Sequence, residues 1–341
     1  MKKIKMISSL VSGIIGFTSV FIMTGSAYGN DSNGGSLYTL EEVVVTARKR
    51  EESLQNAPIS ITAFGGQDLE RRNITGLADI GQITPNLVFN SSAPISGNSS
   101  TASVFIRGIG QNDYTLVTEP GVGIYIDGVY IARSVGGALD LVDVERIEVL
   151  RGPQGTLFGR NTIGGAISIT SQKPDEELAG RIQLTVGKDQ LTDLKGKLNL
   201  PLGDSVFSSF AISSRKRDGF VKNVQNGLDL GDDDSLSARA ALRWLASDKV
   251  SVDFSLDATK ERENGAASFA VAADGLSPLG AANNVVFLGA LGCAPPPGPI
   301  GNTNCFNSQW VTDGQRISNG THPQYSELDI WRAGMTIEWE L

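Results

Sequence analysis

The chain has 341 residues, of which 40% are hydrophobic and 19% charged, a composition typical of a folded protein with room for two domains. Its 37 acidic residues outnumber 29 basic ones and give a formal net charge of -8, which argues against nucleic acid as a partner. The 40 glycines recur in pairs and clusters between short β-branched runs, which predicts many tight turns and a β-rich fold.

Residues 1–29 are predicted to be a secretory signal peptide. An apolar stretch over 6–23 is followed by small residues and preceded by Lys2, Lys3 and Lys5. A retained membrane anchor is the alternative, but the stretch is short and rich in Ser and Gly for a span of about 20 residues. Cleavage is expected between Ala27 and Asn30. No later segment suits a transmembrane helix, so a membrane location requires a β-barrel.

A short β-branched run lies in the next segment, 30–55, which is predicted to be a periplasmic arm. The run consists of Glu42, Val43, Val44, Val45, Thr46 and Ala47. An extended, mobile strand with unpaired backbone groups is suited to adding itself to the exposed sheet edge of a partner. An ordinary strand is the alternative that the residues alone leave open.

This run resembles the TonB box of TonB-dependent outer-membrane receptors, and residues 48–64 continue as plug domains of that family do. The resemblance implies that TonB, energised from the inner membrane, pairs with the strand, and that a pull on it rearranges the plug. It also implies an α+β plug domain with a small mixed sheet over 56–175, followed by a transmembrane barrel of about 22 strands.

Short elements are predicted in the first half of the plug. Residues 59–64 alternate as a strand does, and 68–73 and 76–83 are expected to be helical before Pro85. A further strand is expected at 104–108, where it ends in a glycine turn.

The second half of the plug contains the clearest turn signal. Asp127-Gly128 lies between two β-branched and aromatic runs within 123–131, which predicts a type I′ hairpin. Residues 144–159 alternate charged and apolar side chains before a glycine-rich turn, and a strand resumes at 164–170. No dinucleotide or P-loop motif stands between a strand and a long helix here, so tight turns account for the glycines.

The same region carries the motifs most similar to the receptor family. They include Arg107, Gly108, Asp127, Gly128, Arg151, Gly152, Pro153, Gly159, Gly164 and Gly165. The resemblance implies that Arg107 and Arg151 face glutamates on the barrel wall and hold the plug until it is pulled. From the residues alone, both arginines would be surface charges at strand ends.

After Pro174 the pattern changes to longer alternating strands, and 176–341 is predicted to be part of a transmembrane β-barrel. About six antiparallel strands are expected, most of them near the 9–11 residues that cross a bilayer, with one face toward lipid and the other toward a wet lumen. Strands of a soluble sandwich are shorter, about 5–6 residues. The predicted segments are 179–187, 191–200, 206–215, 235–246, 249–260 and 326–341.

The connections between these strands alternate in length. The loops over 216–234 and 261–325 are long and are expected to be extracellular, whereas the short turns are expected in the periplasm. Cys293 and Cys305 lie in the second long loop, where a local disulfide is expected and two unpaired thiols are the alternative. With His322 as the only histidine, a zinc site is disfavoured.

The predicted function is TonB-dependent import of a scarce nutrient across the outer membrane of a Gram-negative bacterium, with a ferric siderophore as the cargo most common in the family. A passive porin-like channel and a periplasmic enzyme are the alternatives. The sequence shows no catalytic constellation, so neither enzymatic activity nor a cofactor is expected. About six strands cannot close a barrel, so the chain is expected to be a fragment that does not transport alone.

Overall fold

The computed structural model describes residues 44–45, 52–92, 99–112, 118–132, 143–266, 276–287, 291–294, 302, 305, 307–308, 311, 317–318 and 325–340. The predicted signal peptide and most of the predicted arm lie outside these residues. Within the described part, no helix has the length and apolar character needed to cross a membrane.

β1 (Val44–Val45) lies in the segment that was expected to be an unpaired arm. It pairs in antiparallel fashion with β2 (Glu52–Ser53), with Val44 opposite Ser53, and Val45 is fully buried. Val44 and Val45 of the β-branched run therefore form a strand, as predicted. The expectation that its backbone is unpaired is wrong at Val44 and Val45, because the chain folds back and β2 occupies one edge of the strand.

The central sheet of the plug region is mixed, as predicted. Its strand order is β3-β9-β10-β7-β8, with β7 and β10 parallel and the other neighbours antiparallel. All of β7 is buried, as expected for a strand that is covered on both faces. The strands are β3 (Ser60–Gly65), β7 (Val122–Ile126), β8 (Val129–Tyr130), β9 (Val144–Arg151) and β10 (Gly165–Ser171).

Short helices and a second sheet share one hydrophobic core with the central sheet. Leu77, Ile106, Ile147 and Ile167 come from different elements, and each is at most 1% exposed. The predicted helices and the strand near 104–108 are confirmed, with boundaries shifted by up to two residues. The elements are α1 (Gly66–Arg71), α2 (Leu77–Ile83), α3 (Gly155–Phe158), β4 (Leu87–Asn90), β5 (Ser103–Ile106) and β6 (Ile109–Gln111).

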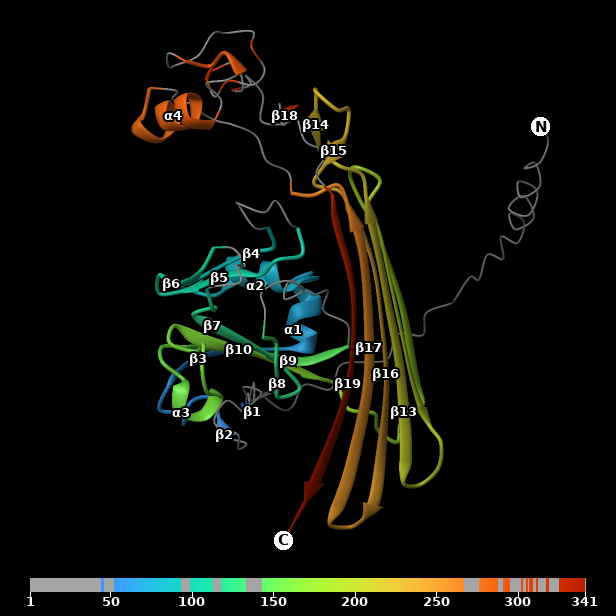
Figure 1. Ribbon diagram of the computed structural model, residues 1–341. Coiled ribbons are helices and arrows are strands. Elements are labelled where there is room, and N and C mark those ends of the chain that lie inside the picture. The colour runs from blue at the N-terminus through green and yellow to red at the C-terminus, as the bar shows by residue number, and fades with distance from the viewer. Residues whose placement is uncertain are drawn as a thin grey trace, which may run out of the picture. The chain divides into compact units, whose positions relative to one another are not determined.

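The second half of the chain forms a six-stranded antiparallel sheet, which we call the wall, in the order β11-β12-β13-β16-β17-β19. Its long strands stand side by side (Figure 1). Each predicted segment is confirmed as a strand. The strands are β11 (Ala179–Val186), β12 (Thr192–Pro201), β13 (Val206–Arg217), β16 (Asp233–Ser247), β17 (Val250–Glu263) and β19 (Ser326–Trp339).

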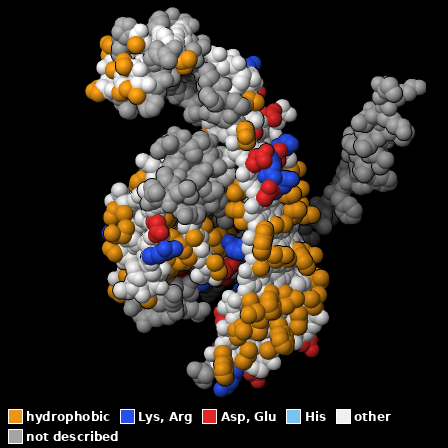
Figure 2. Space-filling view, in the orientation of Figure 1, with side chains coloured by type: hydrophobic (Ala, Val, Ile, Leu, Met, Phe, Trp, Pro, Cys, Tyr) orange, Lys and Arg blue, Asp and Glu red, His pale blue; other side chains and the backbone are white. Residues whose placement is uncertain are grey.

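The outward face of the wall is apolar. Figure 2 shows a broad band of hydrophobic side chains over these strands, with acidic and basic side chains gathered above it. Trp331 and Trp339 stand at the two ends of one outward row in β19, 78% and 69% exposed. Their separation along the strand is roughly 26 Å at about 3.3 Å per residue, or on the order of 20 Å along the barrel axis at a tilt of about 40°, so both side chains fall within an apolar band of about 25 Å.

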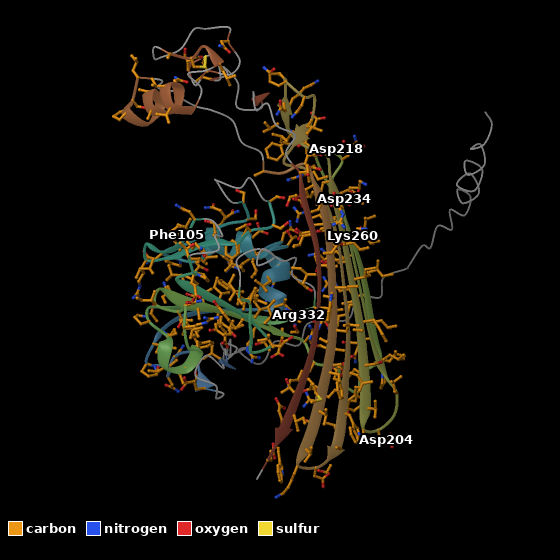
Figure 3. The ribbon with its side chains drawn as sticks, in the orientation of Figure 1. Phe105, Asp204, Asp218, Asp234, Lys260 and Arg332 are labelled. Carbon is orange, nitrogen blue, oxygen red and sulfur yellow. A yellow bond between two sulfur atoms is a disulfide. The ribbon has the colours of Figure 1, made fainter. Side chains whose placement is uncertain are left out.

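The short turns between β12 and β13 and between β16 and β17 lie at one end of the wall, where the Leu245 backbone N–H donates to the Ser205 carbonyl at 2.8 Å. The long connections lie at the other end, and the short turn between β11 and β12 lies there too, because the Asp218 backbone N–H donates to the Asp189 carbonyl at 2.8 Å. Figure 3 shows Asp204, in the turn between β12 and β13, at one end, and Asp218, after β13, at the other. The two long connections meet at the second end, because β14 (Val221–Asn223) pairs with β15 (Asp229–Leu230) and also with β18 (Ile317–Ser318).

The second long connection contains α4 (Pro278–Ala282), the π-helix η1 (Asn283–Phe287) and the predicted disulfide. Cys293 and Cys305 are fully buried, and their Cα atoms are 5.2 Å apart. The pairing of the two cysteines is confirmed. It closes a small loop within a segment that has little other regular structure among its described residues.

Candidate gate between the plug and the wall

The hairpin of β7 and β8 is built to present one carboxylate. Asp127 and Gly128 both have positive φ, 50° and 79°, as the predicted type I′ turn requires. The Asp127 carboxylate accepts hydrogen bonds from the Ser171 backbone N–H at 2.8 Å and the Ser171 hydroxyl at 2.9 Å. The end of β10 therefore fixes the direction in which this side chain points.

Asp127 also reaches the wall. Its Oδ2 lies 3.1 Å from Nη2 of Arg239 on β16, whose side chain is only 7% exposed. Arg239 Nη1 donates to Asp257 Oδ1 on β17 at 2.6 Å, and Asp257 Oδ2 lies 3.0 Å from Arg332 Nη2 on β19. We call Asp127, Arg239, Asp257 and Arg332 the latch. It is a row of alternating charges that begins on the plug and crosses three wall strands.

The segment that connects the plug to the wall is tied down by a second charged group. Lys173 Nζ lies 2.8 Å from Glu338 Oε1 and 3.2 Å from Asp253 Oδ2, both on the wall. Burial disfavours the ammonium, but the two carboxylates outweigh it and hold the pKa of Lys173 above its usual value. Lys173 is therefore charged at any physiological pH, and this tether does not switch with pH.

Helix α1 and the residues after it form a third set of contacts with the wall. Glu70 of α1 pairs with Arg181 of β11, and Arg215 Nη1 of β13 donates to the Thr75 hydroxyl at 2.6 Å. Further along the wall, Lys197 Nζ lies 2.5 Å from Asp143 Oδ1. These contacts join the two regions through polar groups, which water can replace when the regions separate.

Arg107 and Arg151 take other positions than the resemblance suggested. Arg107 is exposed and, with φ of 52°, opens the tight turn between β5 and β6. Arg151 ends β9 and donates to the Pro85 carbonyl at 3.3 Å. Among the contacts of the described residues, neither arginine pairs with a wall carboxylate. Their predicted role against barrel glutamates stays a prediction.

The predicted glycines serve the turns and the close packing of the plug. Gly108, Gly152 and Gly159 have positive φ, and Gly108 completes the turn that Arg107 opens. At Gly165 a Cβ would lie 2.2 Å from the Leu150 carbonyl oxygen, and at Gly164 it would lie 2.9 Å from the Ile109 carbonyl oxygen. The rigid geometry beside the hairpin therefore depends on the missing side chains. Pro153 lies in the bend between β9 and α3.

Most wall partners in these contacts were not singled out from the sequence. Arg239 was visible as a charge on the polar face of its strand, but its partners were not. The register supplies the missing signal, because Arg239 is directly opposite Asp257, and Asp257 is directly opposite Arg332. Opposite charges on facing positions of neighbouring strands attract each other. Thr75 and Arg215 gave no sequence signal that would link them.

Nothing in the described part of the chain suggests a metal site. No group of three or more His, Cys, Asp or Glu side chains within it is placed to hold an ion. The charged side chains described above between the plug and the wall form ion pairs and hydrogen bonds with one another. This arrangement suits reversible attachment of the plug to the wall.

Comparison with known proteins supports the assignment of the plug. Residues 53–166 match the model of the TonB-dependent Receptor Plug Domain. The chain is 31% identical over 220 residues to the vitamin B12 transporter BtuB of Vibrio vulnificus, covering 63% of this chain and 34% of that protein. It is 29% identical over 222 residues to the iron-regulated outer membrane virulence protein of Vibrio cholerae, covering 63% and 31%.

The fold is similar to that of solved receptors. The crystal structure of the ferric yersiniabactin uptake receptor FyuA from Yersinia pestis superposes with a TM-score of 0.55 and 28% identity, covering 61% of this chain and 32% of that one. The chain thus spans about a third of the length of the relatives it matches. Residues 53–166 are thus a TonB-dependent receptor plug domain, and with the adjoining antiparallel wall the chain is similar to TonB-dependent receptors of the outer membrane.

Proposed function

We propose that the protein imports a scarce nutrient across the outer membrane with energy delivered by TonB. The observation that carries this proposal is the attachment of the plug. The hairpin carboxylate of Asp127 binds a charged row on the wall, Lys173 ties the connecting segment, and α1 is held by Glu70. Such contacts hold a closure firmly and yet re-form after each opening, since they involve no covalent bond and little apolar burial.

TonB is proposed to bind residues 42–47 by strand addition. β1 already forms a strand, and β2 leads through a short turn into β3 and then directly into α1. A pull on Val45 is therefore transmitted along the chain to Glu70, which contacts Arg181 of the wall. The strand must expose an edge to TonB, either its free edge or the one that β2 occupies.

A ferric siderophore is the proposed cargo. The names of similar proteins support a scarce metal complex: one is a ferric yersiniabactin uptake receptor, another is iron-regulated, and a third is a vitamin B12 transporter. The residues that contact the cargo are not identified by the described part of the chain. We infer no chemical change to the cargo.

A passive porin-like channel is the competing proposal. It gives no reason for a folded plug fixed to the wall by buried charges, such as Arg239 with its 7% exposed side chain. It also gives no reason for a β-branched strand at 44–45 ahead of the plug.

The two proposals differ in their need for TonB. Uptake of radiolabelled ferric siderophores and of cyanocobalamin is measured in cells that express the receptor gene, with and without TonB, and the purified receptor is placed in a planar bilayer. We expect uptake of one cargo to require TonB and the bilayer to show no steady conductance. Uptake without TonB, together with an open channel, would establish the porin instead.

A further inference from the structure

Two cavities lie between the plug and the wall on the side of β13. The lower cavity, of about 320 Å³, is bounded by α1 and by β11, β12 and β13. The upper cavity, of about 410 Å³, is bounded by the start of α2, the residues after β4, and the ends of β13, β16 and β17. α1 lies on the side of the plug that faces the wall (Figure 1).

One row of inward side chains on β13 lines both cavities. Ala211 and Ser213 line the lower cavity, and Arg215 and Arg217 line the upper one. These residues alternate along the strand, so they follow one another on the same face. The two cavities are therefore consecutive compartments along a single strand, and Arg215 stands where one gives way to the other.

The boundary between the compartments is a hydrogen bond. Arg215 Nη1 donates to the Thr75 hydroxyl at 2.6 Å, and Thr75 is a lining residue of both cavities. Each partner is held from behind. Asp79 accepts from the Thr75 backbone N–H at 3.0 Å, and Asp233 lies 3.3 Å from Arg215 Nε. The contact thus joins a fixed point on the plug to a fixed point on the wall.

The position of Thr75 in the chain connects this contact to the arm. Thr75 follows α1, and α1 follows β3 without an intervening loop. On the wall side of α1, Glu70 pairs with Arg181 of β11. A displacement of β3 and α1 would therefore separate Thr75 from Arg215, whereas the latch at Asp127 lies on a different strand pair and can stay closed.

We propose that the cargo route follows the inward face of β13, and that the hydrogen bond between Arg215 and Thr75 is the gate between its upper and lower compartments. This proposal rests on the proposed import function and adds its route. When α1 moves, the gate opens and the two compartments become one polar passage along the wall.

Thiol accessibility tests the gate in the full receptor. Ser213→Cys places a thiol in the lower compartment, where Ser213 is 2% exposed, and Ser91→Cys places one at the exposed mouth of the upper compartment. Cys293 and Cys305 do not react, because they form a disulfide. Intact cells are treated with an anionic fluorescent maleimide that is too large for general porins, and the rate of labelling is measured.

We expect Ser91→Cys to label rapidly in every background and Ser213→Cys to label slowly while the gate is intact. Adding Thr75→Val, which removes the hydroxyl but keeps the shape, or Arg215→Ala should raise labelling of Ser213→Cys by about tenfold or more, because each variant loses the hydrogen bond between the Thr75 hydroxyl and the charged Arg215 guanidinium. Thr75→Ser keeps the hydroxyl and should leave labelling slow. Lys216→Ala is the matched control, since Lys216 is the next residue on β13 and faces outward toward Asp234.

Equal labelling of Ser213→Cys with and without the Thr75 hydroxyl would overturn the gate. If the Ser213 variant does not assemble, Ala211→Cys reports on the same compartment. The outcome is separate from that of the import proposal. If uptake depends on TonB but the labelling rate is unchanged in the Thr75 and Arg215 variants, the gate proposal is wrong and the import proposal is retained. If labelling is faster in those variants but uptake does not need TonB, the import proposal is wrong and the gate proposal is retained.

Discussion

The Asp127 carboxylate at the turn of the plug hairpin lies 3.1 Å from the guanidinium of Arg239 on the wall. The same guanidinium binds Asp257 at 2.6 Å, and it is nearly excluded from solvent. A single plug residue therefore completes the neutralisation of a buried wall charge. Without Asp127, the buried charge of Arg239 loses one of its two carboxylate partners. Because a buried charge that lacks a partner is costly in free energy, the latch contributes to the attachment of the plug.

Asp127→Ala should weaken the attachment of the plug by about 1–3 kcal/mol, because a hydrogen bond to a buried charged group is lost. Thermal unfolding of the receptor in detergent and protease digestion of the plug measure the effect. Since Asp127 also binds Ser171, a double-mutant cycle with Arg239→Ala isolates the pair.

Asp329→Ala is the matched control for the latch. Asp329 pairs with Arg262, but its side chain is 67% exposed, so its removal should change stability by less than about 0.5 kcal/mol. An equal effect of the two substitutions would show that the latch has no special weight.

Gly165→Ala should destabilise the plug on the order of 3 kcal/mol, because the added Cβ would meet the Leu150 carbonyl oxygen at 2.2 Å and φ is 151°. Gly155→Ala is the control, since a Cβ there has nothing within 4 Å and Gly155 lies in α3. That change should be neutral or slightly stabilising. Denaturant unfolding followed by the fluorescence of plug-specific labels compares the two, and similar midpoints would contradict the close approach at Gly165.

Leu256→Arg should impair membrane insertion, because Leu256 lies on the outward face of β17 and is 54% exposed. An arginine near the middle of the lipid band costs about 2–4 kcal/mol. Leu256→Met keeps the volume and apolar character and should behave as the parent. The fraction of folded receptor is measured by heat-modifiable migration on gels, and equal folding of the two variants would place this face away from lipid.

Cys293→Ser should loosen the second long loop without affecting the wall. A disulfide that closes a loop of this size stabilises by at most about 3 kcal/mol, mainly through the unfolded chain. We expect external protease to cut the variant between β17 and β19 faster than the parent, while cleavage within the plug is unchanged. If both regions became sensitive together, the disulfide would have a wider structural role.

The sequence predicted the strands of the wall closely, because alternation over long segments is a strong local signal. The hairpin at Asp127-Gly128 was also predictable from a local signal, because few residue pairs adopt positive φ twice in succession. The fold of the plug as a mixed sheet came from the family resemblance, and the structure bears it out.

The contacts between plug and wall were not predictable, because they join residues far apart in the chain. Asp127 and Arg239 are both ordinary charges in their own segments, and only the packing of the hairpin against β16 brings them together. The pairing of β1 with β2 was missed because a short β-branched run carries no information on whether an edge is occupied. Arg107 and Arg151 were singled out by the family resemblance. In the structure, Arg107 lies in a tight turn with positive φ, and Arg151 donates a hydrogen bond to the Pro85 carbonyl.

The most direct test of the account is deletion of residues 43–46 in the complete receptor gene, with uptake measured against a deletion of equal length in the glycine-rich segment over 32–36. We expect the first deletion to abolish uptake of the cargo at unchanged receptor abundance, because TonB loses its strand, and the second to preserve it. Uptake that persists without residues 43–46 would contradict energised import through this plug.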